Sequence, residues 1–458
     1  MSYQSSISWT ATAFTLACGS GSGDGREDSA DGSISISISQ GSITTAATDE
    51  PTEGSGSISA TGSMTSGTDS ATDNPSSADN TGGDEEPNFD LGVPDGGTAC
   101  PEGDGTLTHS FIWIANSGQG TVSKINTQTL VEAGRYIVRP DSAGNPSRTS
   151  VSLSGNVAVA NRSGGVVKIY ADVASCQESN GTPGIQTSSG AADIQPWGTE
   201  ECVAWYTAFP YATQRPLAWA QGVWSDATCS YHDEKLWTSG GNNNGVADVL
   251  LLDGETGVID DMVQVPSIGW AQLYGGAVDG DGNFWTVDHN WDGASTLYRI
   301  GRNDLSVDSW PVTGDVHYGL AVDKVGRAWL CGSGGASRFD PVAQTWTHLP
   351  PINPGSALGG CMEDADGILW NSAYPDALLV GIDTETVQIV QQLAIPEYVH
   401  GISIDFDGNV WGVGFSSSNA YRIDVATQTI DTVTGLVAAY TYSDMTGFAL
   451  AAAGTPSG

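Results

Sequence analysis

The chain has 458 residues, with 15 Lys and Arg against 53 Asp and Glu and a formal net charge of −38 at pH 7. A protein this acidic repels nucleic acid and anionic lipid surfaces, so neither is expected as a partner of its folded part. Seven cysteines are typical of an exported chain, and we expect a monomer in an oxidising compartment.

The first 18 residues contain a short apolar run that ends in Thr15-Leu16-Ala17-Cys18. This ending resembles the cleavage box of bacterial lipoproteins, which implies a lipid anchor on Cys18 at an outer membrane or cell surface, although no Lys or Arg precedes the run. The alternative is an incidental cysteine in an N-terminal extension. Because no apolar run is long enough to span a bilayer, Cys18 would be the only membrane attachment.

Residues 19–104 are rich in Ser, Gly, Thr, Asp and Ala, and Arg26 is their single basic residue. Such a segment cannot bury enough apolar surface to offset its ordering entropy. The composition predicts a disordered acidic linker between the N-terminus and a folded domain.

A strand motif recurs seven times between residues 105 and 452. Its copies begin at Phe111, Asn156, Lys235, Asn283, Arg327, Ile368 and Asn409, and all but the second (Ala158) carry Trp at the third position. Most copies follow one another at about 40 to 50 residues, which is the length of one four-stranded blade. The sequence therefore predicts an all-β fold, a seven-bladed β-propeller over 105–452, followed by a disordered tail at 453–458.

One interval between copies, from Ala158 to Trp237, is far longer than the rest. We interpret residues 172–214 as an insertion, which either caps one face of the propeller or is an idle loop. Cys176, Cys202 and Cys229 fall in this interval, and their pairing cannot be read from the sequence. Cys331 and Cys361 occupy comparable positions on neighbouring blades, and we predict a disulfide between them.

Ring closure follows from what the two ends of the repeat lack. The first Trp strand, at Phe111, has no inner strand before it, whereas Thr441–Leu450 matches the inner-strand pattern without a Trp strand after it. We expect the C-terminal strand to complete the first blade, which leaves the ring without an open edge.

Two rings of residues are expected at one mouth of the central channel, the default ligand site of a propeller. The first ring precedes the inner-strand Gly and consists of Thr446, Ser147, Gln221, Tyr274, Tyr318, Gly359 and His400. The second lies three residues after the Trp position and consists of Asn116, Asn161, Gly240, Asp288, Gly332, Ala373 and Gly414. Arg148, His317 and His289 are expected beside them.

Three Asp-x-Asp-Gly turns begin at Asp279, Asp364 and Asp405. Their oxygen spacing is compatible with Ca²⁺, but an Asp-Gly hairpin turn in which Asp caps its own backbone explains them as well.

The combined pattern G-[ILA]-x-x-D-x-D-G-N-x-W resembles the streptogramin B lyase and NHL-type propeller superfamily, and more loosely the gluconolactonase-like calcium propellers. The whole layout is similar to secreted lipoproteins of myxobacterial type. In the lyases a His before the inner-strand Gly and a Glu after the Trp hold Mg²⁺ near a general base. That resemblance implies His400 as catalytic base, but Gly414 stands where its blade should supply Glu.

The calcium propellers use converging Glu, Asn and Asp, of which Asn116, Asn161 and Asp288 supply two types. The possible cofactors are therefore Ca²⁺ or Mg²⁺, although His400 and Asp288 fall on blades expected to face each other across the channel, too far apart to share one ion.

Two function classes remain. The first is an exported module that binds a small molecule, glycan or protein through the mouth and the insertion. The second is a metal-dependent lyase or hydrolase of the streptogramin B lyase or lactonase type, in which a chelatable, stoichiometric metal ion would be required.

Overall fold

The structure, a computed structural model, describes residues 110–225, 227–269, 272–290, 294–316, 318–354 and 358–453. The segments 1–18 and 19–104, with Cys18, lie outside the described residues, as do His317 and residues 454–458. Within the described residues, no helix is long and apolar enough to cross a membrane.

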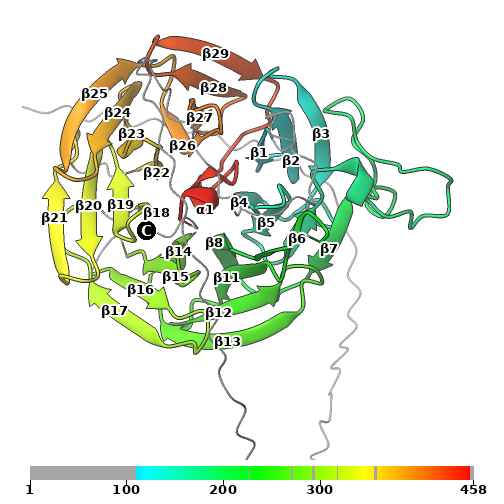
Figure 1. Ribbon diagram of the computed structural model, residues 1–458, viewed down its shortest axis with the longest axis horizontal. Coiled ribbons are helices and arrows are strands. Elements are labelled where there is room, and N and C mark those ends of the chain that lie inside the picture. Colours follow the sequence, from blue (N-terminus) through cyan, green and yellow to red (C-terminus); the bar gives the residue numbers. More distant parts are fainter. Residues whose placement is uncertain are drawn as a thin grey trace, which may run out of the picture. The chain divides into compact units, whose positions relative to one another are not determined.

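Seven antiparallel sheets surround a central axis, as predicted, and each is one blade (Figure 1). The blades are numbered in chain order, and within a complete blade the first strand is innermost. Blade 1 contains β1 (Phe111–Asn116), β2 (Thr121–Asn126) and β3 (Glu132–Ile137); blade 2 contains β4 (Pro146–Val151), β5 (Val157–Asn161), β6 (Val166–Ile169) and β7 (Val203–Thr207); blade 3 contains β8 (Thr213–Ala220), β11 (Lys235–Gly241), β12 (Val246–Asp253) and β13 (Ile259–Pro266).

The other four blades follow the same order from the axis outwards. Blade 4 contains β14 (Leu273–Val278), β15 (Phe284–Asp288), β16 (Thr296–Ile300) and β17 (Val307–Pro311); blade 5 contains β18 (Gly319–Val322), β19 (Ala328–Gly332), β20 (Gly335–Asp340) and β21 (Thr345–Leu349); blade 6 contains β22 (Cys361–Glu363), β23 (Ile368–Ala373), β24 (Leu378–Asp383) and β25 (Gln388–Ala394); blade 7 contains β26 (Val399–Ile404), β27 (Val410–Gly414), β28 (Asn419–Asp424) and β29 (Thr429–Thr434).

In blades 4 to 7 the repeated Trp bonds the turn of its own hairpin. In blade 7, Asp405 accepts hydrogen bonds from the backbone N–H groups of Asp407 and Asn409 and from Trp411 Nε1 (2.8 Å). The turns at Asp279 and Asp364 bond the Trp of the following strand in the same way. The carboxylates are thus used within the hairpins, so the turn interpretation of these motifs accounts for them without Ca²⁺.

The C-terminal segment closes the ring, but not as the strand that the sequence predicted. The Trp113 N–H donates to the Met445 carbonyl (2.9 Å), the Tyr440 N–H donates to the Ala115 carbonyl, and Asn116 forms an isolated bridge with Ala439. The expected strand Thr441–Leu450 is wrong in form, because its last residues enter the helix α1 (Phe448–Ala453).

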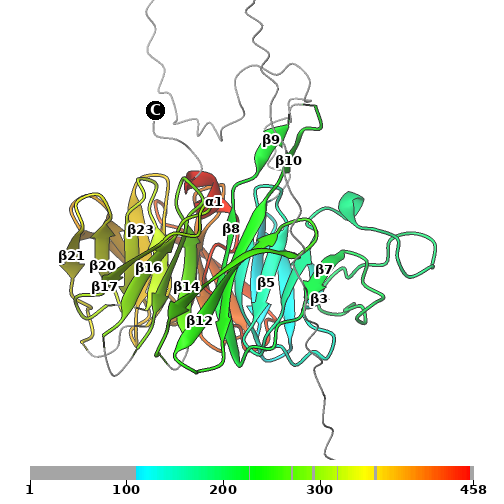
Figure 2. The same ribbon diagram turned by 90° about the horizontal axis from the view of Figure 1, so that it is seen from below.

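This segment, Ala439–Gly447, fills the central channel. It bonds β4 of blade 2 through Val151 N–H, which donates to the Asp444 carbonyl. It also explains a glycine of the repeat, since a Cβ on Gly401 would collide with the Thr441 carbonyl oxygen. Because α1 packs at the carboxyl ends of the inner strands, the channel has an α1 face and an opposite mouth face, where the inner strands begin (Figure 2).

Two insertions, rather than one, lengthen the interval between Ala158 and Trp237. Residues 203–207, expected within the insertion, are the outer strand β7, so the first excursion runs from the turn η1 (Val173–Ser175) to Cys202. The second is a hairpin of β9 (Val223–Ser225) and β10 (Ser230–His232), which projects on the α1 face (Figure 2).

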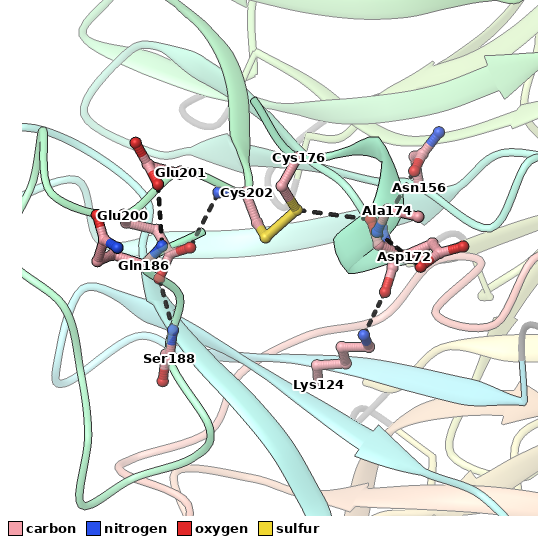
Figure 3. The surroundings of a disulfide bond; sticks show 11 residues. Lys124, Asn156, Asp172, Ala174, Cys176, Gln186, Ser188, Glu200, Glu201 and Cys202 are labelled. Atoms are coloured by element: carbon pink, nitrogen blue, oxygen red, sulfur yellow. Dashed lines mark hydrogen bonds between the residues drawn. A yellow bond between two sulfur atoms is a disulfide. The ribbon is translucent and has the colours of Figure 1, made fainter. Parts of the chain in front are cut away.

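The first excursion does not cap a mouth of the channel, contrary to one expectation from the sequence. It leaves the outer edge of blade 2 and contacts blade 1, where Ser188 Oγ accepts from the Arg135 N–H (Figure 1). Cys176 and Cys202 form a disulfide across its base, and Glu200 and Glu201 accept backbone N–H groups of the same loop (Figure 3). The excursion is therefore an ordered lateral extension of the rim.

The predicted disulfide between Cys331 and Cys361 is confirmed, with the Cα atoms 6.1 Å apart. It joins β19 of blade 5 to β22 of blade 6. Both disulfides are of the kind found in oxidising, extracytoplasmic compartments.

Candidate functional site

Tyrosine, histidine and arginine side chains gather at the mouth face of the channel. Tyr274 and His400 come from the starts of β14 and β26, and Tyr318 immediately precedes β18. Arg148 comes from β4, and Tyr440 and Tyr442 come from the segment that fills the channel. We call these six residues the mouth cluster.

Hydrogen bonds connect the hydroxyl groups of the cluster. The Tyr274 hydroxyl lies 2.7 Å from that of Tyr318 and 2.9 Å from that of Tyr440. The Tyr318 hydroxyl also lies 2.8 Å from that of Tyr440 and 3.2 Å from His400 Nε2. Since Tyr398 bonds His400 Nδ1 (2.9 Å), both ring nitrogens of the histidine are occupied by tyrosine hydroxyls.

Arg148 is a cation with unused donors in the centre of this cluster. Its side chain is fully buried, and its guanidinium carbon lies 3.3 Å from the ring centroid of Tyr442 and 4.9 Å from that of Tyr274. Nη1 donates to the Ser147 carbonyl, but Nε and Nη2 have no hydrogen-bond partner among the described residues.

A buried unpaired charge costs several kcal/mol, of which a desolvated cation–π contact returns about 2 kcal/mol. Although burial opposes the charged form, Tyr442 and Tyr274 raise the pKa of Arg148, so it stays protonated.

The rim adds positive charge instead of neutralising it. Arg162 lies 4.0 Å from the ring centroid of Tyr440, and Arg215 lies 5.3 Å from that of Tyr274. Burial and repulsion from Arg215 and Arg148 lower the pKa of Arg162, whereas attraction to Tyr440 raises it and offsets part of this shift. The mouth is therefore a positive region in a strongly acidic protein.

The positive field acts on the two titratable groups that could serve as bases. Burial, followed by Arg148 and Arg162, lowers the pKa of His400 well below its usual value, so His400 is neutral. Burial opposes ionisation of Tyr274, but Arg148 and Arg215 outweigh it and lower the pKa of Tyr274 to about 8. Tyr274 is thus the first group in the cluster to become an anion.

The sequence predicted some of these positions and misplaced others. Tyr274, Tyr318, His400, Arg148 and Ser147 lie together at the mouth face, and His289 packs edge-on against Tyr318. Gly359, also of the predicted first ring, would approach the Tyr398 hydroxyl if it carried a Cβ.

Gln221 and Thr446 are not part of this group. Gln221 follows the end of β8, where its carbonyl accepts from Arg302, because the inner strand of blade 3 begins at Thr213. Thr446 bonds Ser403 and Ile404 near the end of β26, so both residues lie toward the α1 face.

The three residues considered as metal ligands are used inside the fold. Asn116 bonds Ser123 and the Val437 N–H, and Asn161 donates to the Val138 carbonyl. Asp288 accepts from Ser267 Oγ and from the Ile268 and Gly269 N–H groups.

These bonds tie loops to their blades, and Asp288 and His400 belong to separate networks. Across the described ranges, no group of three or more His, Cys, Asp and Glu side chains could hold a metal ion. All three side chains make hydrogen bonds within the fold, and their assignment as ligands of one ion stays a prediction.

Several residues of the cluster and of its rim were missed from the sequence. Tyr442 lies in the segment interpreted as a strand, Tyr440 directly precedes that segment, and Arg215 directly follows the expected insertion. Arg162 could have been found, since it directly follows the second-ring residue Asn161.

A cavity of about 50 Å³ lies beneath α1, at the other end of the channel from the mouth cluster. Its lining includes Trp219, Met362, Leu450 and the carboxyl groups of Glu363 and Asp444. Burial raises the pKa of Glu363 to about 7 and that of Asp444 to about 6. A space of this size holds water, and Asp444 already caps α1 through the Gly447 and Leu450 N–H groups.

Comparison with known proteins supports the fold. No protein-family model and no curated protein matches this sequence. A solved protein from Lactobacillus plantarum is 13% identical, with a TM-score of 0.50 over 72% of this chain and 97% of its own.

Virginiamycin B lyase from Staphylococcus aureus is 13% identical with a TM-score of 0.46, over 65% of this chain and 89% of its own. A streptogramin B lyase structure is 13% identical with a TM-score of 0.47, over 67% of this chain and 88% of its own. At 13% identity, the likeness to the Lactobacillus plantarum protein extends to the fold alone.

Proposed function

We propose that this protein is an extracytoplasmic propeller that binds a small ligand through the mouth cluster. The observation that carries the proposal is Arg148, whose Nε and Nη2 lack acceptors among the described residues although the side chain is fully buried. More than 90% of buried polar groups in native proteins are satisfied, so two unpaired donors on a buried cation call for a partner such as a ligand or an ordered water. The aromatic rings around Arg148 supply the apolar surface that such a ligand also needs.

A thermal-shift screen of the full chain tests this proposal. Neutral glycans, small organic acids, amines and short peptides are added separately, and the unfolding temperature is measured for each. A ligand of the mouth should stabilise the wild type, and the stabilisation should be lost in Tyr318→Phe, which removes a hydroxyl of the cluster but keeps the ring.

Tyr298→Phe is the matched control, because the Tyr298 hydroxyl, on the outer strand β16 of blade 4, donates to the Pro266 carbonyl of blade 3. If every stabilising compound acts equally on Tyr318→Phe and Tyr298→Phe, no ligand uses the mouth, and the proposal is wrong.

The location within the extracytoplasmic space is part of the proposal. The two disulfides support an oxidising compartment, and the lipobox-like ending at Cys18 would anchor the protein to a membrane. Fractionation of the producing cells tests the anchor: Cys18→Ser should move the protein from the membrane fraction to the soluble fraction. Equal membrane retention of both forms would rule out lipidation at Cys18.

The metal-dependent lyase or hydrolase is a second candidate, and Tyr274 is the observation that favours it. A tyrosine with its pKa lowered to about 8 is a usable general base beside His400. This reading requires a divalent ion at the mouth. The protein is dialysed against Ca²⁺ or Mg²⁺, and its metal content is then measured. If the protein is a metal-dependent enzyme, the assay should find a stoichiometric ion that a chelator removes. If the mouth only binds a ligand, the assay should find none.

A further inference from the structure

We infer that the ligand of the mouth cluster carries a carboxylate, which the edge of Arg148 formed by Nε and Nη2 receives through two parallel hydrogen bonds. The inference rests on the proposed function, since it names the chemistry of that same site. The five N–H donors of a guanidinium lie in one plane and form edges that match the two oxygens of a carboxylate.

The surroundings of Arg148 leave the edge formed by Nε and Nη2 available to a ligand. Nη1 is used by the Ser147 carbonyl, and one face of the guanidinium is covered by the Tyr442 ring at 3.3 Å. The remaining donors, Nε and Nη2, are side by side on the guanidinium and make no hydrogen bond to any described residue. Two adjacent donors without acceptors are the complement of two carboxylate oxygens.

Further unused polar atoms belong to residues in contact with Arg148. Ser147 Oγ and the Tyr442 hydroxyl are both buried and have no hydrogen-bond partner among the described residues. While the two guanidinium donors bind the carboxylate, these two hydroxyl groups are available to bind a second polar group of the ligand. The rings of Tyr274, Tyr318 and Tyr442 enclose this region and suit a flat organic molecule better than a hydrated inorganic ion.

The charge around the site selects an anion. Arg162 and Arg215 stand at the rim. Burial first and nearby arginines second lower the pKa of His400 and of Arg162, and arginines lower the pKa of Tyr274 against the effect of burial. The groups that raise the pKa of Arg148 are tyrosines. Although the chain as a whole carries a net charge of −38, the local positive potential of the three arginines would draw a small anion to the mouth.

Tyr274 is the internal competitor of such an anion. Its ring is 4.9 Å from the Arg148 guanidinium, so a Tyr274 phenolate would neutralise the same charge that a bound carboxylate neutralises. The groups that face Tyr274 are Arg148, Arg215, Tyr318, Tyr440, Tyr442 and His289. Binding of a carboxylate and ionisation of Tyr274 therefore oppose each other, and each must weaken the other to the same extent.

Access to the edge requires a local movement, because every cluster residue except Tyr440 is buried. Tyr440 is the half-buried member, and it lies in a stretch of the C-terminal segment outside regular secondary structure. A ligand that displaces the Tyr440 side chain would reach Arg148 from the mouth face.

The experiment uses the full chain and four probes: acetate, benzoate, the neutral isostere benzamide, and inorganic phosphate. Affinity is measured by calorimetry at pH 7, and the tyrosinate absorbance is titrated with and without benzoate. We expect benzoate to bind, benzamide to bind at least about tenfold more weakly, and benzoate to shift the first tyrosinate midpoint to higher pH.

Arg148→Met should lower the benzoate affinity by about tenfold or more, because it removes the cation while nearly keeping the side-chain volume. Arg422→Met is the matched control, since Arg422 pairs with Asp431 away from the cluster and its replacement removes the same net charge. Circular dichroism of both variants verifies that the fold is retained.

The outcomes separate the inference from the proposal on which it rests. Equal binding of benzamide and benzoate, or benzoate binding that survives in Arg148→Met, would leave a ligand site at the mouth but overturn the carboxylate. Binding of phosphate without acetate or benzoate would overturn it as well. If no probe binds, the inference is wrong, and the broader screen with Tyr318→Phe then decides whether the mouth binds anything at all.

Discussion

The backbone N–H of Trp113 donates to the carbonyl oxygen of Met445, and this 2.9 Å bond joins the first strand of the ring to the last stretch of the chain. The segment that carries Met445 fills the channel, contributes Tyr440 and Tyr442 to the mouth cluster, and ends in α1 on the other face. Ring closure and the candidate site therefore depend on the same nine residues, Ala439–Gly447.

Deletion of residues 440–458 should abolish soluble folded protein. The deletion exposes the inner edge of β1 and removes the buried side chains of Tyr442, Met445 and Phe448, so the ring loses its closure and part of its core. Gel filtration and circular dichroism of the truncated chain measure the result. Removal of residues 454–458 alone is the control and should leave the unfolding temperature unchanged, whereas a well-folded 1–439 fragment would contradict the closure.

Glu363→Gln should change the pH dependence of stability. Burial raises the pKa of Glu363 to about 7, so its contribution to stability is present below its unfolded value near 4.5 and is lost as the pH rises through 7. The amide avoids that loss and can still accept from the Lys324 N–H, which bonds Glu363 Oε2.

Chemical denaturation at pH 5 and pH 8 tests this expectation. The variant should be more stable than the wild type at pH 8 by about 2 kcal/mol, with the difference vanishing or reversing at pH 5. Glu385→Gln is the control, because the Glu385 side chain is 71% exposed. A constant difference between Glu363→Gln and wild type at both pH values would show that Glu363 is ionised throughout.

The repeat made the fold readable from the sequence, because each blade encodes the same hairpin. The Asp of the turn and the Trp of the next strand bond each other in blades 4 to 7, and their spacing is visible without a structure. The α1 helix was not readable, since the alternation in Thr441–Leu450 suits an inner strand as well as a channel-filling segment.

Only those residues of the site that belong to the repeat could be predicted from the sequence. Tyr274, Tyr318 and His400 stand at equivalent points of three blades, so the repeat placed them at one mouth. The residues that complete the site break the repeat: Tyr440 and Tyr442 lie outside any blade strand, and the β9–β10 hairpin shifted the apparent start of blade 3, which misplaced Gln221. Their positions depend on tertiary packing, which periodicity does not report.

Reduction of the Cys176–Cys202 disulfide should open the lateral extension and leave the ring intact. The bond closes a loop between positions 26 residues apart, for which chain entropy gives about 3 kcal/mol of stabilisation. The Cys176→Ser, Cys202→Ser double variant should therefore be cleaved faster within residues 177–199 by a non-specific protease. Mass spectrometry of the fragments shows where cleavage occurs, and loss of the entire fold in the double variant would contradict an independent extension.

His400→Ala should weaken ligand binding moderately rather than abolish it. His400 is neutral and bonds Tyr318 and Tyr398, so in a binding site it acts through the positions of those hydroxyls. We expect a loss of about 1 to 2 kcal/mol in affinity for a mouth ligand, measured by calorimetry. If the protein is instead an enzyme with His400 as base, turnover should fall by about a hundredfold while the affinity stays nearly constant.

One tyrosine of the cluster should titrate near pH 8. Burial opposes this ionisation, but Arg148 and Arg215 lower the pKa of Tyr274 to about 8, whereas burial first and Tyr274 second raise the pKa of Tyr440. The folded protein binds the Tyr274 proton less tightly than the unfolded chain, so Tyr274 adds stability as the pH rises from about 8 toward 10. In a spectrophotometric titration, Tyr274→Phe should remove the first tyrosinate step, and Arg148→Met should move it to higher pH. A first step that stays in place in Arg148→Met would show that the guanidinium does not govern this tyrosine, while a first step that survives in Tyr274→Phe would assign the ionisation to another residue.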